Sequence, residues 1–190
     1  TQVAEGELDL PDFYHTVKSL DQVVAVDYTI PGCPPEPEQI WAVLQVVVAA
    51  LTEGAELPPT GSVVGAGDVA VCEECPLEKQ EKSITRFYRP YEMTPEPDLC
   101  LLEQGIVCMG PATRAGCGAL CPQVNMGCRG CYGPLPGVED QGAKMLSAIA
   151  SVTDVGAAGE DEAELEQKIA EGMETLVDPA GTFYRFTMAH

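Results

Sequence analysis

The sequence is poor in positive charge, in aromatic residues and in long apolar runs. Ten Lys and Arg residues stand against thirty Asp and Glu, so the 190-residue chain has a formal net charge of −20 at pH 7. Such a surface repels phosphate groups, which excludes nucleic acid as the expected partner. Aromatic residues make up 6% of the chain, a thin share for a large core. The longest apolar stretch, Ile40 to Leu51, is far short of the roughly 20 residues that span a bilayer, so we expect no membrane span.

The sequence also lacks the patterns of common catalytic sites. A Ser/His/Asp arrangement, a phosphate-binding P-loop and a G-x-G-x-x-G run after a strand are all missing. Catalysis by organic side chains therefore has no expected location in this chain. A basic-then-apolar leader is missing too, and residue 1 is Thr, so we expect a mature or partial product whose true start lies upstream.

Cysteine is abundant, and its distribution is uneven. Eight of the nine cysteines fall between Cys72 and Cys131, which leaves Cys33 alone. A disulfide framework is usually even in number and spread along a secreted chain. Closely spaced thiols instead favour metal or iron–sulfur ligation in a reducing compartment, and we expect a cytoplasmic protein.

The first third of the chain predicts one βα unit of an α/β sheet. Residues 22–28 are apolar and β-branched, which predicts a buried strand, and residues 29–35 form a proline-rich turn that contains Cys33. A buried helix is expected from Glu38 to Glu53, with Gly54 placed to end it. A single unit cannot bury its own sheet, so further sheet must come from upstream or from a partner.

The rest of the chain divides into two parts. Residues 61–153 are rich in Gly, Pro and Cys, so something other than a conventional core must organise them, and a helix is expected over 137–151. Residues 154–190 form an acidic tail, in which Leu165, Ile169, Met173 and Leu176 predict an amphipathic helix on a surface. We therefore expect three regions: 1–60, 61–153 and 154–190.

The eight clustered cysteines divide as four plus four. The first group opens with a C-x2-C pair and the second closes with one; the groups are Cys72, Cys75, Cys100 and Cys108, then Cys117, Cys121, Cys128 and Cys131. Four thiolates satisfy either one zinc ion or one cubane cluster. Two structural zinc sites are thus an open alternative to two clusters.

Four features favour clusters over zinc. One ligand group runs into the next without a clean break, and Cys33 has no partner nearby in sequence. Seven of the ten basic residues lie between Lys79 and Lys144, where they would stabilise anionic clusters. Glycine lets backbone approach a bulky cluster and donate N–H bonds to its sulfurs, and the ligands are surrounded by Gly105, Gly110, Gly116, Gly118, Gly127, Gly130 and Gly133.

The joined motifs resemble the small subunit of [NiFe] hydrogenases. They are Pro-Gly-Cys33-Pro-Pro, Cys72-Glu-Glu-Cys75-Pro, Cys100-x7-Cys108-Met-Gly-Pro and Asn125-Met-Gly-Cys128-Arg-Gly-Cys131-Tyr-Gly-Pro. The similarity covers about residues 23–152 and is greatest to the cytoplasmic branch, which includes F420-non-reducing enzymes and sulfhydrogenases. It implies a flavodoxin-like domain, of which 1–60 is the closing part, followed by a loop-rich iron–sulfur domain over 61–153. It also implies an electron-transfer subunit that serves a hydrogenase large subunit with a Ni–Fe site and a further redox subunit containing flavin or iron–sulfur.

The resemblance assigns each cysteine to a cluster. Cys33 corresponds to the last ligand of the proximal cluster, the first group to the distal cluster, and Cys117, Cys128 and Cys131 to the medial cluster. Cys121 corresponds to the fourth medial ligand, which implies two complete [4Fe-4S] clusters. The other three proximal ligands have no counterpart here, so a third cluster is implied only if upstream residues supply them.

A rival family shares the Gly-Cys-Pro-Pro turn. It is the 20-kDa-type subunit of NADH dehydrogenase and membrane-bound hydrogenases, which carries one cluster and lacks the eight later cysteines. The sequence therefore argues against it, while the zinc-stabilised interaction module remains the alternative outside redox chemistry.

Overall fold

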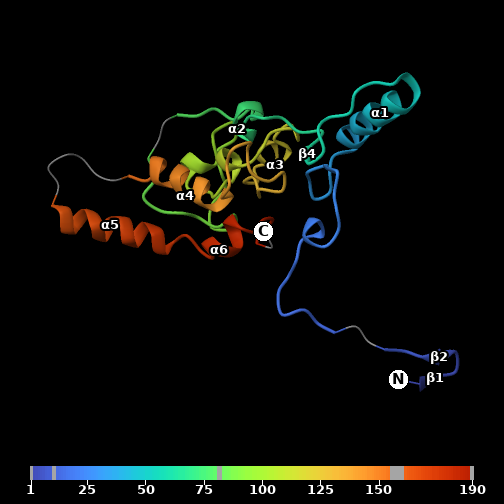
Figure 1. Ribbon diagram of the computed structural model, residues 1–190. Coiled ribbons are helices and arrows are strands. Elements are labelled where there is room, and N and C mark those ends of the chain that lie inside the picture. The colour runs from blue at the N-terminus through green and yellow to red at the C-terminus, as the bar shows by residue number, and fades with distance from the viewer. Residues whose placement is uncertain (1, 10–11, 81–82, 155–160, 189–190) are drawn as a thin grey trace.

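The computed structural model describes residues 2–9, 12–80, 83–154 and 161–188. The elements are short and the fold is mixed α/β, with a small N-terminal hairpin that extends away from the rest (Figure 1). The strands are β1 (Gln2–Val3), β2 (Gly6–Glu7), β3 (Tyr28–Thr29) and β4 (Ser62–Val63). The helices are α1 (Pro37–Glu53), α2 (Val71–Glu74), α3 (Leu120–Gln123), α4 (Gln141–Val152), α5 (Glu162–Glu174) and α6 (Pro179–Phe183), with 3-10 turns η1 (Leu20–Gln22), η2 (Leu102–Gln104) and η3 (Gly110–Ala112).

β3, α1 and β4 form one βαβ unit. β3 pairs in parallel with β4, through Tyr28 with Ser62 and Thr29 with Val63. A parallel pair requires a crossover, and α1 supplies it. The α/β class expected from the sequence is therefore confirmed at this level.

The expected strand over 22–28 is mostly wrong. The 3-10 turn η1 ends at Gln22, the first residue of the expected strand, and Val23 and Val24 are exposed. The strand is therefore confined to Tyr28–Thr29. A β-branched run needs a neighbouring strand to satisfy its backbone, and β4 offers a partner for two residues alone.

The expected helix over 38–53 is confirmed as α1, which begins at Pro37 and ends at Gly54 in the left-handed conformation (φ 71°). Its expected burial is wrong within this chain. Gln39 is its buried residue, whereas Trp41 and Leu51 are 63% and 82% exposed. The two short strands beside α1 offer too little surface to cover an apolar helix.

The hydrophobic core lies in the cysteine-rich half of the molecule. Contrary to expectation, this Gly/Pro-rich segment does form a core, because α4 and the C-terminal tail contribute to it. Met145 and Ile149 of α4 pack with Leu176 and Phe183 of the tail. Two thiols, Cys108 and Cys128, belong to the same cluster of buried side chains.

The two expected C-terminal helices are present with shifted starts. α4 begins at Gln141 rather than at residue 137, because the Asp140 carboxylate caps it by accepting from the Ala143 N–H at 2.8 Å. The tail helix is α5, which contains Leu165, Ile169 and Met173 but ends at Glu174, before the expected Leu176. Residues 155–160 of the expected tail lie outside the described residues. Within the described ranges, no helix has both the length and the apolar character that crossing a bilayer requires.

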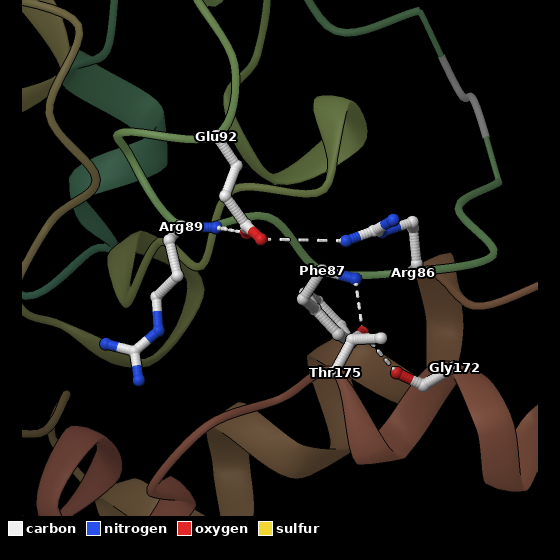
Figure 2. Close-up of polar contacts among 6 residues, drawn as sticks. All are labelled: Arg86, Phe87, Arg89, Glu92, Gly172 and Thr175. Atoms are coloured by element: carbon white, nitrogen blue, oxygen red, sulfur yellow. Dashed lines mark hydrogen bonds and ion pairs between the residues drawn. The ribbon is translucent and has the colours of Figure 1, made fainter.

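The end of α5 packs against the segment that carries Arg86 and Phe87 (Figure 2). The Phe87 N–H donates to Thr175 Oγ1 at 2.7 Å, and that hydroxyl donates to the Gly172 carbonyl oxygen at 2.5 Å. Arg86 forms an ion pair with Glu92 at 3.8 Å. The bond from the Phe87 N–H to the Thr175 side chain thus attaches the acidic tail to the cysteine-rich region.

Replacing Gly172 by Ala tests this packing. In an exposed helix the change stabilises by about 1 kcal/mol. Here a Cβ would lie 2.6 Å from the Thr85 carbonyl oxygen. We therefore expect the free energy of unfolding to fall by about 1–3 kcal/mol, as for other overpacked sites. Chemical denaturation of the full chain, followed by circular dichroism, measures it.

Glu166→Ala, on an exposed position of the same helix, is the control and should change stability by less than about 0.5 kcal/mol. A Gly172→Ala protein more stable than the parent would contradict the packing described for α5.

Candidate metal centre

Four thiols line one cavity of about 310 Å³. They are Cys72, Cys75, Cys100 and Cys108, and we call them the first thiol set. Cys72 lies on α2 and Cys75 directly follows it, while Cys100 and Cys108 flank η2 on the chain. The spacing argument grouped these four from the sequence, and the structure brings them to one cavity.

Burial makes two of these thiols, Cys72 and Cys108, hard to ionise without a metal. Burial raises the pKa of Cys108 to about 12 and that of Cys72 to about 11, and the neighbouring thiols add to the shift at both sites. Lys79, which lines the same cavity, opposes the shift at Cys72. Metal-free Cys72 and Cys108 are therefore neutral at pH 7, and binding of a metal by their thiolates would release protons.

The cavity fits a group bulkier than one ion. A Cβ at Gly110 would lie 3.0 Å from the Cys72 Sγ and 3.5 Å from the Cys108 Sγ, so glycine leaves this space open beside two thiols. Four thiols in an otherwise largely apolar wall are the donor set of a [4Fe-4S] cluster. Across the described ranges, no three His, Cys, Asp or Glu side chains are grouped so as to hold a single metal ion.

The other four clustered cysteines form the second thiol set: Cys117, Cys121, Cys128 and Cys131. Burial raises the pKa of the Cys131 thiol, and the nearby Cys117 and Cys121 raise it further. Burial raises the pKa of Cys128 to about 12, with contributions from Cys108 and Cys131. These mutual effects place the members of the set near one another.

The two thiol sets are in direct contact. The Cys128 N–H donates to the Cys108 Sγ at 3.3 Å. The N–H of Met109, the residue after Cys108, donates in turn to the Cys128 carbonyl oxygen at 2.9 Å. Backbone N–H groups therefore join Cys108 of the first set to Cys128 of the second.

Glu74 makes a second connection between the sets, which the sequence analysis missed. Its carboxylate accepts from the Gly116 N–H at 3.0 and 3.1 Å and from the Ala119 N–H at 3.3 Å, and the Cys117 Sγ lies 3.8 Å from it. Residues 115–120, the Cys117 loop, turn sharply here: Gly116, Gly118 and Ala119 all have positive φ. The sequence offered one signal for this role, an acidic residue inside the C-x2-C motif. The exposed Glu73 fits that signal equally well.

Cys33 has neighbours in the structure, although its place in the sequence suggests that it is isolated. Its side chain is exposed, but its backbone N–H lies beside the Cys131 thiol and opposes the upward shift of that thiol's pKa. The turn that carries Cys33 therefore lies next to the second thiol set. All nine cysteines are free thiols.

A buried polar contact also joins the βαβ unit to the cysteine region. The Tyr132 hydroxyl donates to Gln39 Oε1 at 2.8 Å, and both side chains are buried. Burial, with Cys117 nearby, raises the pKa of Tyr132 to about 12, so the hydroxyl keeps its donor proton at neutral pH. The contact connects the start of α1 to the residue that follows Cys131.

Removing the hydroxyl with Tyr132→Phe should lower the free energy of unfolding by about 1 kcal/mol, the usual net value of one buried hydrogen bond. It should also increase hydrogen exchange of the α1 amides. Tyr91→Phe is the matched control, because that ring is 84% exposed. Equal losses in the two variants would show that the Gln39 contact does not hold the unit in place.

Comparisons with known proteins match different parts of the chain. The family described as NADH ubiquinone oxidoreductase, 20 Kd subunit, matches residues 4–47, which contain Cys33 but none of the eight clustered cysteines. The F420-non-reducing hydrogenase subunit designated G of Methanothermobacter thermautotrophicus is 44% identical over 95% of this chain and 54% of its own length. The corresponding F420-non-reducing hydrogenase iron-sulfur subunit of Archaeoglobus profundus is 41% identical over 78% of this chain and 46% of its own.

The chain thus spans about half the length of these relatives. A third relative, the same F420-non-reducing hydrogenase subunit from Methanothermus fervidus, is 50% identical over 61% of this chain and 89% of its own length. The match to the Methanothermobacter thermautotrophicus subunit covers nearly the whole chain and therefore includes the cysteine-rich region. The relatives confirm the expected hydrogenase-related subunit, while the NADH dehydrogenase alternative is the weaker one. The chain belongs to the family of F420-non-reducing hydrogenase subunits designated G.

Proposed function

We propose that the chain is the electron-transfer small subunit of a [NiFe] hydrogenase. In this role it relays electrons between the Ni–Fe site of a large subunit and a further flavin- or iron–sulfur-containing subunit. The two thiol sets would each hold one [4Fe-4S] cluster, which supplies a one-electron carrier when bound.

The observation that carries the proposal is the continuity of the thiols. The Cys33 turn lies beside Cys131, Cys131 lies near Cys128, and the Cys128 N–H contacts the Cys108 Sγ of the first set. A relay requires its carriers to be adjacent, and a set of unrelated zinc sites does not. All nine cysteines belong to this series of neighbouring sites.

The protein's own groups suit thiolate-bound carriers. Buried apolar side chains such as Leu101 and Leu102 surround the first set and limit water. Lys79 provides positive charge beside Cys72, and backbone N–H groups of Ala119 and Leu120 lower the pKa of Cys117 against the effect of burial. Cations and N–H donors of this kind stabilise metal-bound sulfur.

The family resemblance orders the sites. The first thiol set is the distal cluster, the second is the medial cluster and Cys33 is one ligand of the proximal cluster. The remaining proximal ligands would come from polypeptide that these 190 residues do not contain.

The apolar surface around α1 is the proposed contact with that polypeptide, which would complete the flavodoxin-like domain. A second cavity, of about 420 Å³, is lined by Tyr28, Val43, Val47 and Val63 among other apolar residues. Trp41 and Leu44 are exposed on other faces of α1, so the helix carries uncovered apolar side chains beyond the cavity. Exposed apolar surface of this extent is typical of protein–protein contacts.

Iron and acid-labile sulfide test the proposal directly. Anaerobically purified protein should contain about eight of each per chain from the two thiol sets, and more if a third cluster is complete. Stoichiometric zinc without sulfide would support the zinc-stabilised module instead. About four irons per chain would favour the single-cluster NADH dehydrogenase-like alternative.

Cys121→Ser tests the fourth ligand of the second set. Loss of one thiolate should convert that cubane to a three-iron cluster and raise its potential, which paramagnetic resonance of the oxidised protein detects. Cys75→Ser is the matched variant in the first set and should alter the other signal. If Cys121→Ser leaves the spectrum unchanged, Cys121 is a thiol near the cluster rather than a ligand.

A further inference from the structure

Glu74 lies within the C-x2-C motif of the first thiol set in sequence, but its carboxylate contacts the loop that carries Cys117 of the second set. It sits between Cys72 and Cys75 in the chain, yet its partners are the Gly116 and Ala119 N–H groups and the Cys117 Sγ. The contacts span 42 to 45 residues of sequence. They are therefore a tertiary feature of the fold and not a local property of the C-x2-C motif.

The backbone of the Cys117 loop is shaped around this carboxylate. Ala119 is fully buried and has φ 54°, a left-handed conformation that costs a residue with a Cβ roughly 1–2 kcal/mol. This conformation lets the N–H groups of Gly116 and Ala119 reach the same carboxylate. Such convergence of N–H groups on an anion is a recognised backbone arrangement.

Metal binding would change the contact between Glu74 and Cys117. In the metal-free chain the Cys117 thiol can donate its proton to the carboxylate, across 3.8 Å. A metal-bound thiolate has no such proton. The two backbone N–H bonds remain, so they would keep a negative charge next to a negatively charged ligand.

An anion beside a cluster ligand disfavours the addition of an electron. We propose that Glu74 is a positioning residue with two effects: it holds the Cys117 loop against α2, and its charge lowers the reduction potential of the cluster in the second thiol set. The redox effect rests on the proposed function, whereas the positioning effect depends on the described contacts alone. A residue that lies between two thiols of the first set thereby lowers the reduction potential of the cluster in the second.

The experiment compares three variants in the full chain, purified anaerobically with its native partner subunits. Glu74→Gln removes the charge but keeps an oxygen acceptor of similar reach. Glu74→Ala removes both. Glu73→Gln removes the same charge from the neighbouring, exposed position. Redox titration followed by paramagnetic resonance gives the midpoint potential of each cluster, and the Cys121→Ser signal identifies the second set.

Glu74→Gln should raise the midpoint potential of the second cluster, with at least about a tenfold change in its reduced-to-oxidised ratio at the parental midpoint. For a one-electron couple this equals about 59 mV. Glu73→Gln should leave the second cluster unchanged. Hydrogen exchange of the Gly116 and Ala119 amides should stay slow in Glu74→Gln and become at least about tenfold faster in Glu74→Ala, since an unpaired amide exchanges without local opening.

Each outcome bears on a separate claim. An unchanged potential in Glu74→Gln, or an equal shift in Glu73→Gln, would overturn the redox effect. Slow amide exchange in Glu74→Ala would overturn the positioning effect. A parent protein without acid-labile sulfide would overturn the proposed function and the redox effect together, while the exchange measurement would still decide the positioning effect.

Discussion

The contact between the two thiol sets is the constraint on which the rest of the structure depends. The Cys128 N–H bond to the Cys108 Sγ and the Glu74 contacts with the Cys117 loop cross between segments that are 20 and more than 40 residues apart. Neither set can therefore take its shape independently of the other. Glu74 lies on α2, whereas the residues it contacts, and both Cys108 and Cys128, lie in loops. α4 and the tail supply the apolar surface that packs against this region.

The balance between apolar burial and thiol chemistry explains why a segment rich in Gly and Pro forms a core at all. Cys108 and Cys128 are buried with Val71, Met109 and Met145, so two of the proposed ligands also act as hydrophobic side chains. The same burial makes their ionisation costly. The thiols stabilise the metal-free core as neutral groups, and a metal would exchange that stabilisation for ligand bonds.

The parts of the fold that depend on local pattern could be predicted from the sequence, and those that depend on distant partners could not. Pro37 and Gly54 mark the bounds of α1 by their own backbone preferences, and the C-x2-C pairs predict their own grouping. Residues 22–27 look like a strand, but no local signal reveals that their partner strand is two residues long.

The candidate site follows the same rule. The membership of the first thiol set could be predicted from spacing, because the four thiols that line one cavity lie in one stretch of chain. The roles of Glu74 and Gln39 could not, since each acts on residues more than 40 positions away. Cys33 looked isolated for the same reason: its neighbour, Cys131, is distant in sequence and near in space.

The Gln39–Tyr132 contact has a consequence for the order of folding. The βαβ unit closes locally, by pairing β3 with β4 across a single helix, whereas Gln39 and Tyr132 are separated by 93 residues. Closing a loop of that length costs chain entropy before the contact forms, and the contact itself is a directional hydrogen bond. The βαβ unit can therefore form early and attach to the cysteine-rich region afterwards. The position of Cys33 relative to the other thiols is then decided in this last step of folding.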